Sequence, residues 1–335
     1  MKRLLLVGAG HAHAQVLKNW IAQPLPATEL VLVSPQALAP YSGMVPGWLA
    51  GTYRYADICI DFAALAALAG ARWVIGELAT LDAQRGQVQL TNGQVLAYDL
   101  LSLNVGSTLH PPPSQRSARV LALRPLGALR CAWEQVLADP ELLSRSQALL
   151  PGLAPGAQRA ARAAPAAAGV RVTLGSSDGD VPAEGLLLVG HRRRRPRLAG
   201  RQRTGGGRAR LIRVDACLRS VSHPQVQAVG DCAAWSTLLP KAGVHEVRTE
   251  PVLSHNLPAA LGHGRALPHQ PQLALLALLA TADGRAIASW RGLSAQGRWV
   301  WRWKNRIDRG FVRRFATTAH PQIPMPSSPS TGDPA

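Results

Sequence analysis

The chain begins MKRLLLVGAGHAHA, residues 1–14, and this stretch decides the fold. Residues 3–7 form a short apolar run typical of a buried strand, and residues 12–22 favour a helix. Between them, Gly8 permits a tight turn and Gly10 lets the backbone come close to a ligand. Because the first N–H groups of a helix bind anions, the pattern predicts a dinucleotide-binding α/β unit.

Two positions depart from the usual dinucleotide fingerprint. His13 stands where a third glycine is expected, and Ser34 stands where an acidic residue would hold a ribose. A purely structural strand-to-helix turn is the alternative interpretation. The position of the glycine pair, directly after an N-terminal apolar strand, favours the dinucleotide.

Further elements follow in alternating order through the first 110 residues. The Asn92-Gly93 pair predicts a hairpin turn, and the loop 34–55 is too long for a plain connection, which indicates a functional segment. We expect a helix at 62–69 and strands at 29–33, 72–81, 87–90, 94–97 and 100–103.

The rest of the chain gives weaker patterns. Residues 191–213 resemble no element, and the Pro/Ser-rich tail 321–335 is predicted to be disordered. We expect helices at 126–137, at 157–168 (broken by Pro165) and at 250–261, and strands at 170–174 and 225–229.

A second chemical signal is Val229-Gly230-Asp231, which ends the apolar run 225–229. In isolation, Gly-Asp is a common turn. Together with the N-terminal glycine pair, it places a carboxylate where it can accept hydrogen bonds from ribityl hydroxyls while the first helix holds a pyrophosphate. The two ends of the chain are therefore expected to converge on one ligand.

Composition narrows the class of protein. The 335 residues, 47% hydrophobic and 17% charged, suggest a globular chain of about two domains. The net charge is +18, but residues 192–213 alone hold ten arginines and no acidic residue. This stretch lacks interleaved aromatic residues, so nucleic-acid binding is not expected. Four scattered cysteines without a C-x-x-C motif favour a reducing cytoplasm, and no apolar run is long enough to cross a bilayer.

The flavin-binding parts of the two-dinucleotide-binding-domain flavoproteins resemble Gly8-Ala9-Gly10, the strand 100–103 with Asn104-Val105-Gly106-Ser107, and Val229-Gly230-Asp231. That superfamily includes the pyridine nucleotide-disulfide oxidoreductases and type II NADH dehydrogenases. The chain most resembles the branch found fused to selenide, water dikinase. That likeness spans residues 1–135 and 214–316 and rests on the segments 10–13, 40–47, 220–224, 240–244 and 297–304.

The resemblance implies an FAD held between the glycine turn and Asp231, with NAD(P)H as co-substrate and the isoalloxazine ring near the Tyr41 loop. A redox-active cysteine pair is missing, which disfavours disulfide reduction. His11 and His13 are expected to cap the helix or pack near the flavin rather than bind a metal. No catalytic residue is assigned. The predicted cofactor-binding residues are Gly8, Gly10, His11, Ala12, Tyr41, Ser42, Gly43, Gly106, Gly230, Asp231, Lys241, Ala242 and Gly243.

The middle of the chain lacks a glycine-rich turn for NAD(P)H. Only residues 147–174 resemble the second half of an NADH domain, and the stretch after the apolar run 186–189 is arginine-rich where relatives would carry Ala-Thr-Gly-Ala. Codons can be chosen whose one-base-shifted reading restores that pattern. We therefore hypothesise that residues 190–210 are out of frame and that a segment near 139–145 is lost. An intact frame in the transcript would contradict this.

The C-terminal segment combines aromatic and basic residues. The tryptophans from Trp299 to Trp303 alternate as on a strand, and Trp303, Ile307, Phe311 and Phe315 then recur at every fourth position among arginines. Such a basic amphipathic helix is typical of anionic membrane surfaces. Packing against the FAD domain or a dimer partner is the alternative.

The sequence thus predicts an α/β flavoprotein of the FAD/NAD(P)-binding, Rossmann-like type with a degraded NAD(P)H domain. Electrons would pass from NAD(P)H through flavin to an unidentified small-molecule acceptor, with activity impaired in this chain. A catalytically silent flavoprotein and a basic membrane-binding protein are the alternatives, and a homodimer stays open. The expected location is the cytoplasm, with peripheral contact at the inner face of the membrane.

The domains are FAD-binding (1–110 and 214–297), an NAD(P)H-domain remnant (111–189), an arginine-rich segment (190–213), a basic aromatic segment (298–320) and the tail (321–335).

Overall fold

The computed structural model describes most of the first and last thirds of the chain and parts of its middle. The described residues are 1–106, 108–109, 119–122, 141–144, 147, 149–150, 152–167, 170–175, 186–189, 193–194, 211–235, 243–272 and 274–317. The helix expected at 126–137, the tail 321–335 and most of the arginine-rich segment lie outside them.

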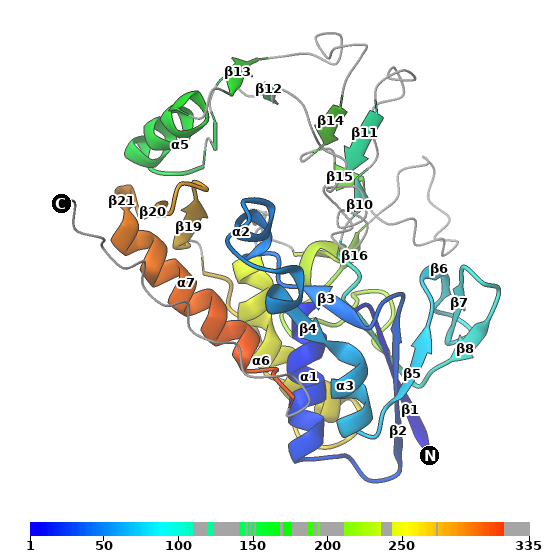
Figure 1. Ribbon diagram of the computed structural model, residues 1–335. Coiled ribbons are helices and arrows are strands. Elements are labelled where there is room, and N and C mark those ends of the chain that lie inside the picture. Colours follow the sequence, from blue (N-terminus) through cyan, green and yellow to red (C-terminus); the bar gives the residue numbers. More distant parts are fainter. Residues whose placement is uncertain are drawn as a thin grey trace.

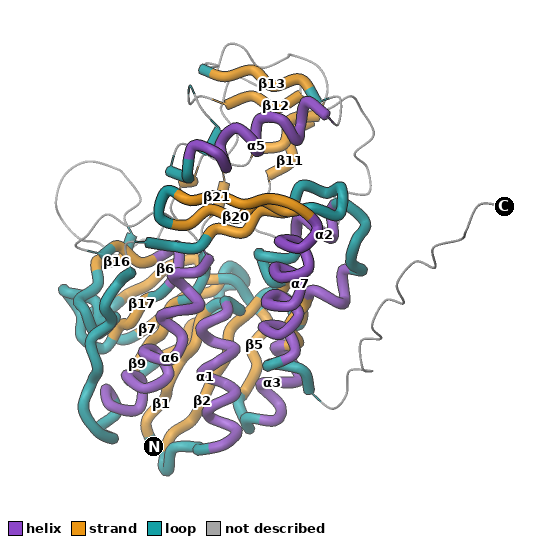
Figure 2. The backbone as a smooth tube through the Cα atoms, turned by 90° about the vertical axis from the view of Figure 1, so that its left-hand side faces the viewer, coloured by secondary structure: helices purple, strands orange, loops and turns teal. Residues whose placement is uncertain are grey.

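A five-stranded parallel sheet forms the centre of the fold, in the order β17-β9-β1-β2-β5. Figure 1 labels β1, β2 and β5 of this sheet, and Figure 2 labels all five strands. Its strands are β1 (Lys2–Val7), β2 (Thr28–Ser34), β5 (Arg72–Ile75), β9 (Leu100–Leu103) and β17 (Val226–Ala228). The last strand, β17, comes from the far end of the chain and pairs with β9. The two segments predicted to converge therefore end in strands of one sheet, β1 and β17, which are separated only by β9.

Both faces of the central strands are apolar, as parallel strands buried on two sides require. In β1, Leu4 and Leu6 face the helices, whereas Leu5 and Val7 face a second layer. This layer is an antiparallel meander of β6 (Leu78–Asp82), β7 (Gln87–Leu90) and β8 (Val95–Ala97). The Asn92-Gly93 hairpin is confirmed, and Gly93 has a φ of +85°. The single strand expected at 72–81 is wrong, because the chain divides into β5 and β6 around Gly76.

Helices cover the other face of the sheet, and Figure 2 shows α6, α1 and α3 side by side over the strands. Their bounds are α1 (His11–Ala22), α3 (Phe62–Leu68) and α6 (Gly243–Ala260). The prediction that the last of these begins at residue 250 is wrong. Pro251 resembles a helix start in the sequence, but it lies inside α6, which begins eight residues before it, at Gly243.

The loop 34–55 is not structureless. It contains β3 (Leu38–Pro40) and α2 (Val45–Leu49), and the 3₁₀ turn η1 (Tyr55–Ile58) follows. Strand β3 pairs with β4 (Cys59–Asp61), which returns the chain to the sheet.

A second, antiparallel sheet of β19 (Ala277–Ala280), β20 (Ala286–Trp290) and β21 (Leu293–Gly297) lies between two helices. On one face Ile287 packs with α5 (Pro155–Ala167), and on the other Ala286 and Ala288 pack with Val300 of α7 (Arg298–Arg313). The alternation of tryptophans as on a strand is therefore wrong, because these residues open a helix. Pro165 lies inside α5 and does not break it.

The remaining described strands are short pairs. Residues 191–213 were expected to form no element, but Arg193–Arg194 (β15) pairs with Thr108–Leu109 (β10), and Ile212–Arg213 (β16) pairs with Ala233–Ala234 (β18). Two parallel pairs complete the set: β11 (Arg119–Ala122) with β14 (Leu186–Val189), and β12 (Glu141–Ser144) with β13 (Arg171–Leu174).

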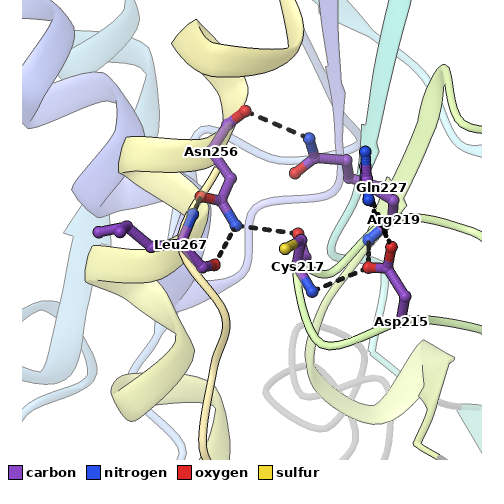
Figure 3. A network of polar contacts seen from close by, with 6 residues as sticks. All are labelled: Asp215, Cys217, Arg219, Gln227, Asn256 and Leu267. Carbon is purple, nitrogen blue, oxygen red and sulfur yellow. Dashed lines mark hydrogen bonds and ion pairs between the residues drawn. The ribbon is translucent and has the colours of Figure 1, made fainter. Parts of the chain in front are cut away.

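Asn256 joins α6 to the segment that leads into β17 (Figure 3). Its Nδ2 donates to the carbonyl of Cys217 at 2.9 Å and to that of Leu267 at 2.8 Å, and its Oδ1 accepts from Leu267 N at 2.7 Å. Nearby, the Asp215 carboxylate accepts from Cys217 N and Arg219 N. These bonds fix the returning segment and the end of α6 in one arrangement.

Candidate functional site

The carboxyl ends of β1 and β9 meet at Asn104, a buried residue that follows β9. A side chain on Gly10 would collide with it, since a Cβ there would lie 2.0 Å from Asn104 Oδ1. A Cβ on Gly8, whose φ is +101°, would lie 2.4 Å from the Asn104 carbonyl oxygen. Both glycines are therefore required by close contact with Asn104: Gly8 with its backbone and Gly10 with its side chain.

The distal Gly-Asp pair reaches the same point. Gly230 and Asp231 lie in the 3₁₀ turn η3 (Gly230–Cys232), and a Cβ on Gly230 would lie 2.9 Å from Asn104 Nδ2. That amide also donates to Val229 O at 3.4 Å. Gly10 and Gly230 thus flank one asparagine, and the two predicted ends of the site are neighbours.

Asn104 itself was not among the predicted site residues. Its Oδ1 is buried and makes no hydrogen bond. A buried polar oxygen without a partner is costly in a folded protein, so such an atom commonly marks a ligand or solvent position. The signal in the sequence is a polar residue directly after a buried strand that ends at the same edge as the glycine turn.

The start of α1 holds an anion from another helix. Gly10 is the N-cap, and the N–H of His11 donates to Glu246 Oε1 of α6 at 2.9 Å. The second carboxylate oxygen lies 3.8 Å from His11 Nδ1. Glu246 also lies against Gly230, where a Cβ would be 3.3 Å from its carboxyl carbon. The sequence analysis did not select Glu246, since its position depends on how α6 packs.

His11 and His13 have different roles. The His11 ring packs edge-on to Tyr41 and Phe311, with centroid distances of 5.1 and 5.5 Å. His13 is fully buried, with Nδ1 2.7 Å from Gly8 O and Nε2 2.8 Å from Ser102 Oγ. Burial lowers the pKa of His13 to about 4, so its ring is neutral. The N-cap of α1 is Gly10, which has no side chain to cap the helix.

The Tyr41 loop closes over the start of α1 under α7. The Tyr41 ring stacks on Phe311 at 4.4 Å, and Gly43 O accepts from Lys304 Nζ at 2.7 Å. Lys304 also pairs with the buried Asp308. Burial raises the pKa of Tyr41 above its ordinary value, so the phenol stays protonated. Lys304 is a contribution of α7 that sequence reasoning missed, whereas the packing of Phe311 agrees with the alternative considered for the C-terminal rings.

Of the other predicted residues, Ser42 Oγ lies 3.4 Å from the position of a Cβ on Gly243, which brings this loop to the first residue of α6. Ala12 is buried in the first turn of α1. Gly106 has a φ of +67° and no atom within 4 Å of a Cβ placed there, so no packed contact ties it to the site. Lys241 and Ala242 lie outside the described residues.

Glu250 is an additional buried acid beside the site. It lies one turn after Glu246 on α6, and Arg314 Nη2 is 3.2 Å from its Oε2 while its Oε1 has no partner. Burial, opposed in part by Arg314, raises the pKa of Glu250 to about 8. Within the described ranges, no three His, Cys, Asp or Glu side chains gather as a metal site would require.

The parallel sheet, the meander on one face and the helices on the other define a Rossmann-like α/β fold. Comparison with solved structures bears this out. The sulfide:quinone oxidoreductase of Aquifex aeolicus has a TM-score of 0.72 at 13% identity, with 94% of this chain and 91% of that one covered.

Two further structures have the same fold. NDH2 from Plasmodium falciparum, in complex with NADH, gives a TM-score of 0.68 at 10% identity and covers 93% of this chain and 97% of its own. NADH:rubredoxin oxidoreductase from Clostridium acetobutylicum gives 0.62 at 14% identity, covering 86% and 81%. No protein-family model and no curated protein matches the chain.

Proposed function

We propose that the chain is an FAD-dependent oxidoreductase that passes electrons from NAD(P)H through flavin to an unidentified small-molecule acceptor. The observation that carries the proposal is the meeting of Gly10 and Gly230 at Asn104, at the carboxyl ends of the sheet. Ligands of open α/β sheets bind at this edge. The NADH named with the Plasmodium structure supports the same class of donor.

The residues present fit FAD. The N–H groups at the start of α1 would hold the pyrophosphate, Asp231 would accept from ribityl hydroxyls, and the unpaired Asn104 Oδ1 offers a further acceptor for a hydroxyl. The Tyr41 loop and Gly243 would border the ring. When bound, FAD supplies the redox chemistry, while this chain's residues orient it and exclude water.

The domain division proposed with this function keeps residues 1–110 and 214–297 as the FAD-binding unit. Residues 111–189 would be the remnant of an NAD(P)H domain, followed by the arginine-rich segment 190–213. On this proposal FAD binds but reduction by NAD(P)H is impaired. A catalytically silent flavoprotein is the second candidate, since the sequence of the middle segment lacks a glycine-rich turn for a second nucleotide.

Purified protein tests the proposal. We expect flavin absorbance that survives gel filtration or returns on addition of FAD, and slow bleaching by NADH without oxygen. Gly10→Ala should abolish FAD binding because its Cβ meets Asn104, whereas Gly310→Ala, with open space around it in α7, should retain it. Absence of FAD binding in the wild-type protein would contradict the proposal, and binding without bleaching would favour the silent flavoprotein.

A membrane contact is proposed for the outer face of α7. Trp299, Trp303 and Ile307 are 58%, 41% and 44% exposed, among arginines that complement anionic lipid. Phe311 and Phe315 do not take part, because they are buried in the core. Among the described residues, no helix combines the length and apolar character needed to cross a membrane.

Vesicle flotation tests this contact. We expect binding to vesicles with anionic lipid and its loss in a triple Trp299→Ser, Trp303→Ser, Ile307→Ser variant, whose core is intact. Equal flotation of both proteins would refute the role of this face. Together with this contact, we propose that the protein is cytoplasmic and touches the membrane peripherally. We also propose that its partners are small molecules and that it binds no nucleic acid. Whether two copies associate would be seen by light scattering in the same preparations.

A further inference from the structure

The start of α1 is already paired with a negative charge from the protein. Glu246, in the first turn of α6, accepts from the N–H of His11, the first residue of α1, at 2.9 Å. The first turn of α1 contains no acidic residue of its own. The carboxylate is therefore the negative charge that faces the positive end of this helix.

Glu246 also lies between the two halves of the predicted cofactor site. Its carboxylate contacts the region of Gly230 on one side and His11 on the other. The neighbouring Asn104 has a buried, unpaired Oδ1 directed at Gly10. The N–H of His11, which already has a partner, and Oδ1 of Asn104, which has none, therefore lie close together. This is the pattern expected where a group of the protein replaces part of a ligand.

A pyrophosphate and the Glu246 carboxylate need the same N–H group. Both are anions, so simultaneous binding would bring like charges together in a poorly solvated place, which is unfavourable. The side chain of Glu246 is 17% exposed, so a path toward solvent is open to it when the phosphate enters. Binding of the dinucleotide must include the cost of releasing this contact.

We propose that Glu246 is an internal competitor for the pyrophosphate and determines how tightly this chain holds a dinucleotide. The inference rests on the proposed function and deepens it. Competition from Glu246 makes the bound cofactor exchangeable. It also distinguishes ligands by charge, because FAD and ADP compete with the carboxylate, whereas riboflavin, which has no phosphate, does not.

The test uses the full chain and two variants. Glu246→Gln keeps an oxygen that can accept from His11 N and removes the charge, and Glu246→Ala removes both. Glu77→Gln, a neutralised exposed glutamate, is the matched control. Dissociation constants for ADP, FAD and riboflavin are measured by calorimetry, and circular dichroism verifies that each variant is folded.

We expect both Glu246 variants to bind ADP and FAD about tenfold more tightly than the wild type. Riboflavin affinity should stay unchanged, and Glu77→Gln should behave as the wild type. Tighter ADP binding without any FAD binding would support the role of Glu246 while contradicting the flavin proposal. Equal FAD affinity in all four proteins would overturn the competitor role and leave the flavin proposal standing. Folded Glu246→Ala that still fails to bind ADP would also overturn it.

Discussion

Two buried asparagines, which lie toward opposite ends of the parallel strands, differ in how completely they are hydrogen-bonded. Asn256, toward the amino-terminal ends of β9 and β17, makes three short bonds with Cys217 and Leu267. Asn104, at the carboxyl ends, makes one long side-chain bond and leaves Oδ1 unpaired. Because buried polar groups are normally paired, the first residue has a structural role, and the second fits the ligand site that we propose.

The comparison extends to the acids and bases around each asparagine. Near Asn256, the carboxylate of Asp215 is paired with Arg219 and with backbone N–H groups. Near Asn104, Glu246 reaches across to another helix and Glu250 is buried with one free oxygen. These incompletely paired groups at the carboxyl edge of the sheet lower the free energy of unfolding, which is typical of functional sites.

The largest effect is expected for Asn256→Ala. It leaves the Leu267 N–H and the carbonyls of Cys217 and Leu267 without partners, so the free energy of unfolding should fall by about 3 kcal/mol. Denaturant unfolding followed by circular dichroism measures it. Asn104→Ala is the matched comparison and should lose under about 1 kcal/mol. Equal losses would remove the distinction between the two asparagines.

Glu250 should make stability depend on pH. Its pKa is raised to about 8 in the folded chain from an ordinary value of 4.5, so the folded state holds the proton more firmly. Stability is therefore highest when the acid is protonated in both states and falls as the pH rises toward 8. Where the folded and unfolded states differ by one whole bound proton, the free energy of unfolding changes by at most about 1.4 kcal/mol per pH unit. The change is smaller for a partly solvated group.

His13 has the opposite sign, because its pKa is lowered from 6.5 to about 4. Between these values only the unfolded chain binds the proton, so stability rises with pH. Glu250→Gln should therefore remove the decline between pH 6.5 and 8 and expose the rise below 6.5. Denaturant midpoints from pH 5 to 9 would reveal this, with Glu77→Gln as control. An unchanged decline in Glu250→Gln would disprove the assignment.

Affinity rather than stability should change in Asn104→Ala. Loss of the unpaired acceptor beside Gly10 should weaken FAD binding about tenfold, or about 1.4 kcal/mol. Fluorescence titration with FAD measures it, and Asn19→Ala, on the exposed side of α1, provides the control. Undiminished affinity would mean that Asn104 only fills space between the glycines.

Much of this edge was predictable from sequence because it depends on local rules. An apolar strand, a glycine turn and a helix specify β1 and α1, and the carboxyl ends of parallel strands must meet, which places Gly230 near Gly10. The roles of Asn104 and Glu246 were not predictable in this way. The role of Glu246 follows from the packing of α6 on α1, a contact between residues more than 200 positions apart. The role of Asn104 follows from the glycines that pack around its side chain.

The C-terminal helix shows a second limit. Residues at every fourth position advance by about 40° around a helix, so a row from Trp303 to Phe315 drifts by roughly a third of a turn. The structure divides this row: Trp303 and Ile307 are exposed, whereas Phe311 and Phe315 are buried. Periodicity identified an amphipathic segment, but only packing against Tyr41 determines which aromatic rings face inward.

The smallest effect on stability is expected for Gln227, which is an exception to the comparison of the two asparagines. Gln227 lies beside Asn256, yet its Oε1 is buried and unpaired and its Nε2 only reaches Asn256 O at 3.5 Å. If unpaired atoms cost stability wherever no ligand uses them, Gln227→Met should be neutral or stabilising by up to about 1 kcal/mol. Denaturant unfolding would measure it. A loss near that of Asn256→Ala would mean that Gln227 belongs to the structural network, and the unpaired oxygen of Asn104 would then carry less weight as the mark of a ligand site.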